Sequence, residues 1–182
     1  MIYVMIYNKE AVYAATLKSV SAATSGLLIA LGVTLSYFPG PIPVGPAYLF
    51  PYQSMINVLA GVLLGPYYAA FVAFSVGAIR IGMGTGTFFS LPGGIPGALF
   101  VGFSYRLTHR YLSAFAEIPG TALVGSFLSA YVVTPLQGHG GSWSTFIYLF
   151  TPAAVAGSVI GYLIVVALDR RHVLERIGLR AS

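Results

Sequence analysis

The chain contains no cysteine and very few charged residues. Only 7% of its 182 residues are charged, whereas 57% are hydrophobic, and the mean hydropathy is +0.85. A soluble domain carries roughly a quarter charged residues, so this composition excludes that class and predicts a protein with several membrane-spanning helices. The lack of cysteine excludes disulfides, thiolate catalysis and metal sites built on Cys.

Acidic residues are the scarcer of the two charge types. The chain has four of them, Glu10, Glu117, Asp169 and Glu175, and all lie at or beyond the expected cytoplasmic ends of apolar runs. We therefore expect no carboxylate within the bilayer, which argues against proton coupling through an intramembrane acid and against an aspartyl protease. The chain also lacks the Gly-x-x-x-x-Gly-Lys phosphate loop, so we expect neither nucleotide hydrolysis nor an enzyme, and no cofactor or metal.

Basic residues are more numerous, and eight of the nine Lys and Arg residues gather in three places. They precede the first apolar run, separate the fourth run from the fifth, or follow the last: Lys9, Lys18, Arg106, Arg110, Arg170, Arg171, Arg176 and Arg180. Short cytoplasmic loops retain Lys and Arg, so all three segments are predicted to be cytoplasmic. This orientation accounts for the net charge of +5, and no nucleic-acid partner is expected.

Six apolar runs are compatible with that distribution. They cover residues 19–38, 52–64, 66–82, 95–105, 118–136 and 143–168. The sequence therefore predicts an all-α, six-helix bundle in the cell membrane, with both termini cytoplasmic, as a single domain over residues 1–182 with a basic tail at 170–182. The second and third runs are short, and irregular backbone at membrane depth is tolerated only in protein or beside a cavity. We therefore expect the Gly- and Pro-rich outer loops to dip into the bundle around an outward-facing pocket.

Two segments resemble a family of membrane transport proteins. Residues 53–66, which read Gln-Ser-Met-Ile-Asn-Val-Leu-Ala-Gly-Val-Leu-Leu-Gly-Pro, are similar to the second helix of substrate-binding S components of energy-coupling factor (ECF) transporters. Arg80 is followed by Gly-Thr-Gly-Thr at 84–87 and by Leu-Pro-Gly-Gly at 91–94, which resembles the ThiW group. That group usually reads Phe-Pro-Gly-Ser at the last site, so one hydroxyl is missing here. The likeness spans most of the chain.

The resemblance implies a function and a set of partners. An S component of this group binds a thiamine precursor, hydroxyethylthiazole, from outside. It then associates with a membrane T component and two cytoplasmic ATPases, which supply the energy source absent from this sequence, and topples in the bilayer to release the ligand. The alternatives are an S component for another small vitamin, including thiamine, or an uncoupled small-molecule facilitator. Thiamine is cationic, so a pocket that contains Arg80 and no carboxylate disfavours it.

Arg80 is the strongest candidate for a site residue, because it is the one basic residue inside an apolar run. A guanidinium at that depth needs acceptors, so Arg80 either holds the carbonyls of residues 84–87 in place or contacts the ligand directly. The other candidate ligand contacts are polar or aromatic residues expected in the outer half of the bundle: Gln53, Asn57, Thr85, Thr87, Tyr131, His139 and Trp143.

Five of these candidates also have a structural interpretation. Gln53 and Asn57 are four residues apart and share a helix face, where amides either bond between helices or line a pocket. Thr85 and Thr87 either bind the ligand or pack their loop against the helices. Trp143 either stacks on an aromatic ligand or anchors its helix at the membrane interface.

Small residues recur at four-residue intervals in three series. These are Ala11, Ala15, Ser19 and Ala23, then Ala22, Gly26 and Ala30 on a neighbouring face, and finally Ala153, Gly157 and Gly161. Such series allow two helices to approach closely. The resemblance implies that the first series docks on the T component, with internal packing as the alternative. For the last series we expect internal packing.

Overall fold

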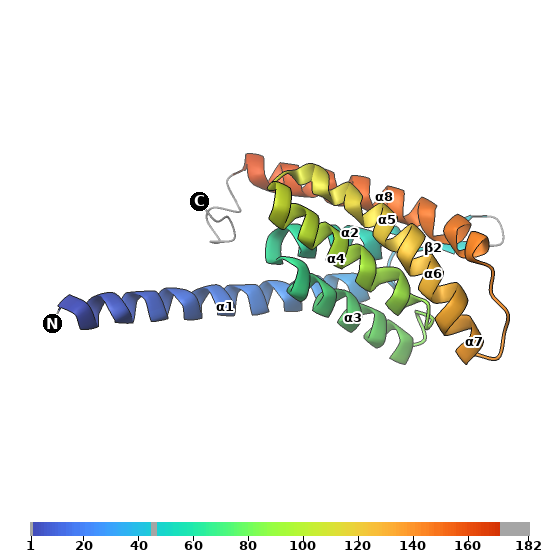
Figure 1. Ribbon diagram of the computed structural model, residues 1–182, viewed down its shortest axis with the longest axis horizontal. Coiled ribbons are helices and arrows are strands. Elements are labelled where there is room, and N and C mark those ends of the chain that lie inside the picture. The colour runs from blue at the N-terminus through green and yellow to red at the C-terminus, as the bar shows by residue number, and fades with distance from the viewer. Residues whose placement is uncertain (1, 45–46, 172–182) are drawn as a thin grey trace.

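The computed structural model describes the backbone of residues 2–44 and 47–171 and the side chains of residues 15–43 and 49–171. Within those ranges the all-α prediction is confirmed, with helical segments at the six predicted places (Figure 1). They are α1 (Ile2–Thr34), α2 (Pro51–Leu64), α3 (Pro66–Gly82), α4 (Ser90–Thr108), a composite fifth segment (Tyr111–Leu136) and α8 (Trp143–Arg170). Most of the predicted basic tail, including Arg176 and Arg180, lies outside the described residues.

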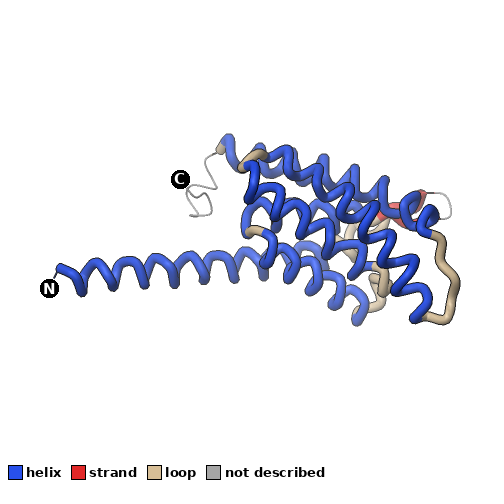
Figure 2. The backbone as a smooth tube through the Cα atoms, viewed as in Figure 1, coloured by secondary structure: helices blue, strands red, loops and turns tan. Residues whose placement is uncertain are grey.

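The loop between α1 and α2 contains regular structure, whereas its Gly- and Pro-rich sequence predicts irregular backbone. Strands β1 (Ile42–Val44) and β2 (Ala47–Leu49) pair antiparallel, with Ile42 opposite Leu49 (Figure 2). The pairing gives hydrogen-bond partners to backbone groups that a proline-rich loop would otherwise leave unpaired.

The fifth segment changes helical type along its length. Its pieces are η1 (Tyr111–Ala116), α5 (Glu117–Pro119), η2 (Gly120–Gly125), α6 (Ser126–Leu128), η3 (Ser129–Val133) and α7 (Thr134–Leu136), of which η1 is a 3₁₀-helix and η2 and η3 are π-helical. Pro119 and Pro135 lack the amide hydrogen that a regular α-helix uses, which favours such irregular turns. A Cβ on Gly120 would lie 2.7 Å from the Gly97 Cα, so the backbones of η2 and α4 are in direct contact.

α2 lies at the centre of the bundle, in contact with α1, α3, α4 and α8. Eleven of its 14 residues are buried. The α8 glycines make the tightest contact with it, because a Cβ on Gly157 would lie 2.5 Å from the Ser54 Cβ and one on Gly161 would lie 2.7 Å from the Val58 Cβ. The predicted internal packing of this small-residue series is therefore confirmed for Gly157 and Gly161.

This contact leads to a stability prediction. Gly157→Ala is expected to lower the thermal unfolding midpoint of the detergent-solubilised protein, because the new methyl group would overlap the α2 backbone at Pro51. Overpacking of this kind costs about 1–3 kcal/mol. Gly26→Ala is the matched control, since a Cβ at Gly26 meets nothing within 4 Å and alanine favours a helix. Equal midpoints for the two variants would contradict the close α2–α8 contact.

The outside of the bundle is strongly apolar. Large hydrophobic side chains are exposed on α1, α3, α4 and α8, including Leu27, Phe71, Phe74, Phe100, Phe103, Tyr148 and Leu163. Three helical stretches, at residues 15–34, 111–136 and 143–170, are long and apolar enough to cross a membrane. Soluble proteins rarely expose apolar surface on this scale, whereas lipid solvates it. These features are those of a multi-pass membrane protein.

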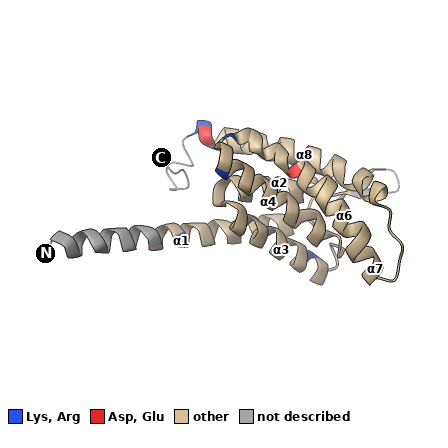
Figure 3. Cartoon of the chain, viewed as in Figure 1, with Lys and Arg blue, Asp and Glu red and all other residues tan. Residues whose placement is uncertain are grey.

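The two ends of the bundle carry different basic residues (Figure 3). α2, α4 and α8 end on one side, where Arg106 and Arg170 occupy the last turns of α4 and α8. α3 runs the other way, so Arg80 in its last turn lies at the opposite end. We call these the basic end and the Arg80 end.

Candidate ligand-binding site

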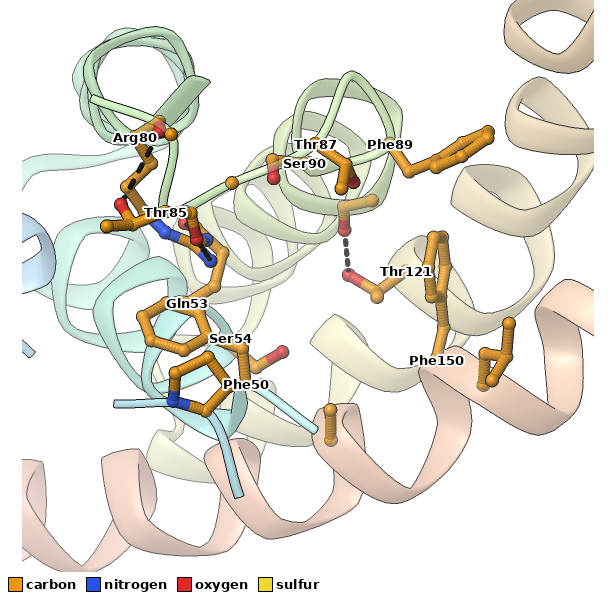
Figure 4. A pocket seen from close by; sticks show the side chains of 16 residues that line it. Phe50, Gln53, Ser54, Arg80, Thr85, Thr87, Phe89, Ser90, Thr121 and Phe150 are labelled. Carbon is orange, nitrogen blue, oxygen red and sulfur yellow. Dashed lines mark hydrogen bonds between the residues drawn. The ribbon is translucent and has the colours of Figure 1, made fainter. Parts of the chain in front are cut away.

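A cavity of about 360 Å³ lies at the Arg80 end. Its walls come from the first turn of α2, the last turn of α3, the loop that joins α3 to α4, the start of α4, η2 and the first half of α8 (Figure 4). The aromatic lining residues are Phe50, Phe89 and Phe150, and the polar ones are Gln53, Ser54, Arg80, Thr85, Thr87, Ser90 and Thr121. Small-molecule pockets occupy roughly 300–1,000 Å³, so this cavity suits a small ligand.

Four of the predicted contacts, namely Gln53, Arg80, Thr85 and Thr87, line this cavity. Asn57 lies one helical turn deeper on α2 and is completely buried. It bonds to Gln53 rather than facing the cavity, since the Gln53 Nε2 donates to the Asn57 Oδ1 over 3.3 Å. The pair therefore acts both as a pocket group and as a link between helices.

The other three predicted contacts are not among the lining residues. Tyr131 is 54% exposed on η3, and His139 is exposed in the loop that follows α7. The Trp143 Nε1 donates to the Leu123 carbonyl over 3.1 Å, so the indole joins α8 to the fifth segment. The loops at the Arg80 end also differ from one another: Pro41 and residues 84–87 border the cavity, whereas His139 and its neighbours are exposed.

Arg80 is the central residue of the cavity wall, and only 5% of it is exposed. Its Nη2 donates to the Thr85 carbonyl over 3.2 Å, and its Nη1 donates to the Gln53 Oε1 over 3.5 Å. Its guanidinium carbon lies 3.6 Å from the centre of the Phe50 ring, at a distance typical of cation–π contact. The expected bond from Arg80 to a carbonyl of residues 84–87 is confirmed, and Arg80 borders the cavity as well.

The loop after α3 folds back on the residue that anchors it. The amides of Thr85 and Gly86 donate to the Arg80 carbonyl over 2.9 and 3.0 Å. Gly84 has a φ of 72°, which favours glycine, and a Cβ on Gly86 would lie 2.9 Å from the Arg80 Cβ. The Thr85 hydroxyl lies 3.0 Å from that of Ser36, which connects the loop to the residues that follow α1. Gly84, Thr85 and Gly86 therefore contribute to the shape of this loop.

Glu117 corrects the expectation that no carboxylate lies inside the bundle. It is completely buried at the start of α5, where its Oε1 accepts hydrogen bonds from the Thr121 hydroxyl over 2.7 Å and the Asn57 Nδ2 over 3.3 Å. The connection between α4 and η1 is only two residues long, so the chain has already re-entered the bundle before Glu117. Gly97 supplies the necessary space, because a Cβ there would collide with the Thr121 and Glu117 side chains.

The sequence contains a pattern that indicates this buried acid. Ser113, Glu117 and Thr121 are spaced four residues apart, and all three are buried in the structure. A polar stripe at helical spacing within an apolar segment indicates a face that points into the bundle, because polar groups avoid lipid.

The polar side chains behind the cavity form a continuous hydrogen-bonded chain. It runs from Arg80 through Gln53 and Asn57 to Glu117, and thus from the end of α3 across α2 to the start of α5. Two carbonyls of α4 join it, because the Asn57 Nδ2 donates to Gly94 over 3.0 Å and the Thr121 hydroxyl, whose single hydrogen is shared with Glu117, lies 2.7 Å from the Gly93 oxygen. We call the series Arg80–Gln53–Asn57–Glu117 the polar chain.

Comparison with known proteins identifies a family for this chain. The sequence profile of a family described as "Thiamine-precursor transporter protein (ThiW)" matches residues 22–171, a range that includes every residue lining the cavity. No curated protein and no solved structure matches the chain. The family is one of transporters and not of enzymes. Since the match covers most of the sequence, the chain belongs to the ThiW family of thiamine-precursor transporter proteins.

Proposed function

We propose that this protein is the substrate-binding S component of an ECF-type importer and that its ligand is hydroxyethylthiazole. The observation that carries the proposal is the cavity itself, which lies within the family-matched region and combines three phenylalanine rings with a few polar groups. Aromatic rings favour stacked or edge-on contact with a flat heterocycle. Donors on Arg80 and hydroxyls at Ser54 and Ser90 suit a ring nitrogen and an alcohol.

Size and charge favour the thiazole precursor over thiamine, which remains the alternative ligand. Thiamine has a second aromatic ring and a permanent positive charge. The cavity lies near the lower end of the range for ligand pockets, and a guanidinium forms part of its wall. A ligand cation next to Arg80 would experience repulsion that is weakly screened inside the bundle.

The proposed orientation places the basic end in the cytoplasm and the Arg80 end outside. Arg106, Arg110, Arg170 and Arg171 then all follow the positive-inside rule. The cavity opens toward the outside in this orientation, where a vitamin precursor is captured. Release into the cell requires partners, for which we propose a membrane T component and two cytoplasmic ATPases.

α1 supplies the proposed docking surface for the T component. Ala15, Ser19 and Ala23 are exposed, and so are Ala22, Gly26 and Ala30 on the neighbouring face. For Ala11 only the backbone is described, as part of α1. Small exposed residues in this arrangement allow another helix to approach closely, and they support docking over internal packing as the role of this series.

Ligand binding by the purified protein is the decisive test of the proposed substrate. Isothermal titration calorimetry is expected to show saturable, one-to-one binding of hydroxyethylthiazole without ATP, and the ligand is expected to raise the thermal unfolding midpoint. Thiamine is expected to bind at least about tenfold more weakly, which corresponds to about 1.4 kcal/mol. Tighter binding of thiamine would replace the substrate assignment, and no binding of either compound would remove it.

A further inference from the structure

The polar chain behind the cavity has a fixed direction. Glutamine and asparagine side chains each have a donor end and an acceptor end, so their orientation depends on their neighbours. Arg80 can only donate hydrogen bonds. At the other end, the Gly94 carbonyl can only accept, and it lies 3.0 Å from the Asn57 Nδ2. Arg80 and the Gly94 carbonyl therefore require the same orientation of the Gln53 and Asn57 side-chain amides.

The direction follows one bond at a time from the Glu117 end. The Asn57 amino group faces Gly94 and Glu117, so its Oδ1 faces α2 residue Gln53. Gln53 must then donate to Asn57, over 3.3 Å, and its Oε1 is left to face Arg80 at 3.5 Å. With that oxygen bonded to Arg80, Gln53 and Arg80 offer the cavity mainly N–H groups.

Glu117 is the member of the polar chain whose burial is not explained by a place in the cavity wall. It does not line the cavity, and it is completely buried. Burying a carboxyl group is costly, so its retention requires compensating interactions. The Glu117 Oε1 receives hydrogen bonds from both Asn57 and Thr121, and Thr121 itself lines the cavity. The carboxyl group thus contacts both polar branches that lead to the ligand site.

We propose that Glu117 is a positioning residue that determines ligand specificity, because it adds a second acceptor beside the Gly94 carbonyl for the Asn57 amino group and so holds the polar chain in the orientation in which Arg80 and Gln53 present donors to a neutral, acceptor-bearing heterocycle. This inference rests on the proposed function, since it concerns the same cavity. A thiazole has an unprotonated ring nitrogen that accepts a hydrogen bond. An N-alkylated thiazolium lacks that lone pair and carries a positive charge, so a donor wall rejects it.

The binding experiment uses two ligands of nearly equal size, hydroxyethylthiazole and its N-methyl thiazolium derivative. Wild-type protein is expected to prefer the neutral compound by about a hundredfold or more. Glu117→Met keeps the length but removes the acceptor, and it is expected to reduce that preference by about tenfold or more. Glu117→Gln retains an acceptor oxygen, so it is expected to keep the preference within about threefold of wild type.

Ser126→Ala is the matched control. Ser126 is completely buried in the same composite helix, and its hydroxyl has no hydrogen-bond partner among the described residues. It is expected to retain the wild-type preference. If Glu117→Met weakens binding of both ligands equally, Glu117 is only structural and the proposal is overturned. The proposal is also overturned if Glu117→Met keeps the full preference, or if Glu117→Gln loses as much of it as Glu117→Met.

A ligand-free measurement separates this proposal from the proposed substrate. Isotope-edited NMR of the side-chain amides in detergent is expected to show protected Gln53 and Asn57 signals in wild type and in Glu117→Gln. The signals are expected to broaden or shift in Glu117→Met. Intact signals in Glu117→Met would overturn the role of Glu117 whatever the ligand. If the signals are lost in Glu117→Met but wild-type protein does not bind hydroxyethylthiazole, the proposed substrate is wrong. The proposed role of Glu117 in the polar chain is then retained.

Discussion

Tryptophan at position 15 or 19 is expected to abolish ATP-dependent uptake while leaving ligand affinity unchanged. Ala15 and Ser19 are exposed on α1 and lie far along the helix from the cavity, which α1 does not line. A bulky side chain on either residue prevents the close helix approach that small residues allow. Uptake of labelled hydroxyethylthiazole would be measured in liposomes containing the S component, the T component and both ATPases, together with co-purification of the T component.

Ala156→Trp provides a control for the size of the new side chain. Ala156 is exposed on α8, so the same substitution on another helix is expected to preserve both uptake and co-purification. Uptake that survives Ala15→Trp and Ser19→Trp would show that this face of α1 is not the docking surface. Uptake without ATP and without the partner subunits would instead favour the alternative function, an uncoupled facilitator.

Arg80→Met is expected to lower ligand affinity by about tenfold or more while the protein remains a monodisperse bundle. Methionine keeps a long apolar side chain but removes the donors to Thr85 and Gln53. A buried acceptor that loses its partner costs about 1–3 kcal/mol, and here the loss occurs in the cavity wall. Calorimetry on the variant measures its affinity for the ligand, and gel filtration tests whether the variant remains monodisperse.

Arg80→Lys distinguishes the charge of Arg80 from its geometry. Lysine keeps the positive charge but lacks the planar guanidinium that bonds to both acceptors. The ligand affinity of Arg80→Lys is therefore expected to fall between those of wild type and Arg80→Met. Affinity within about twofold of wild type in Arg80→Met would indicate that the arginine merely extends toward the membrane surface.

Helix number and the place of the Arg80 loop could be predicted from the sequence, because both depend on local patterns. Apolar runs and Gly-Pro breaks set the helices, and a lone arginine at depth must find nearby carbonyls. The prediction for α3, at residues 66–82, agrees with its observed bounds, Pro66–Gly82.

The burial of Glu117 does not follow from the apolar runs alone, although the four-residue spacing of Ser113, Glu117 and Thr121 indicates it. The depth of a residue near a helix start depends on how tightly the preceding turn closes, and η1 closes it within the bundle. The β1–β2 pairing and the changes of helical type in the fifth segment depend on tertiary contacts as well. For the same reason the sequence could suggest Tyr131, His139 and Trp143 as site residues but could not show that none of them lines the cavity.

The shortness of α2 has a consequence for the environment of the ligand. Its 14 residues extend for about 21 Å, whereas the hydrocarbon core of a bilayer is about 30 Å thick. A cavity at the first turn of such a helix is therefore expected to lie below the level of the lipid headgroups, with protein and acyl chains around it. Mobile ions scarcely penetrate this region, so contacts made there by Arg80 are shielded from the salt of the medium and act at the strength of a low-dielectric interior.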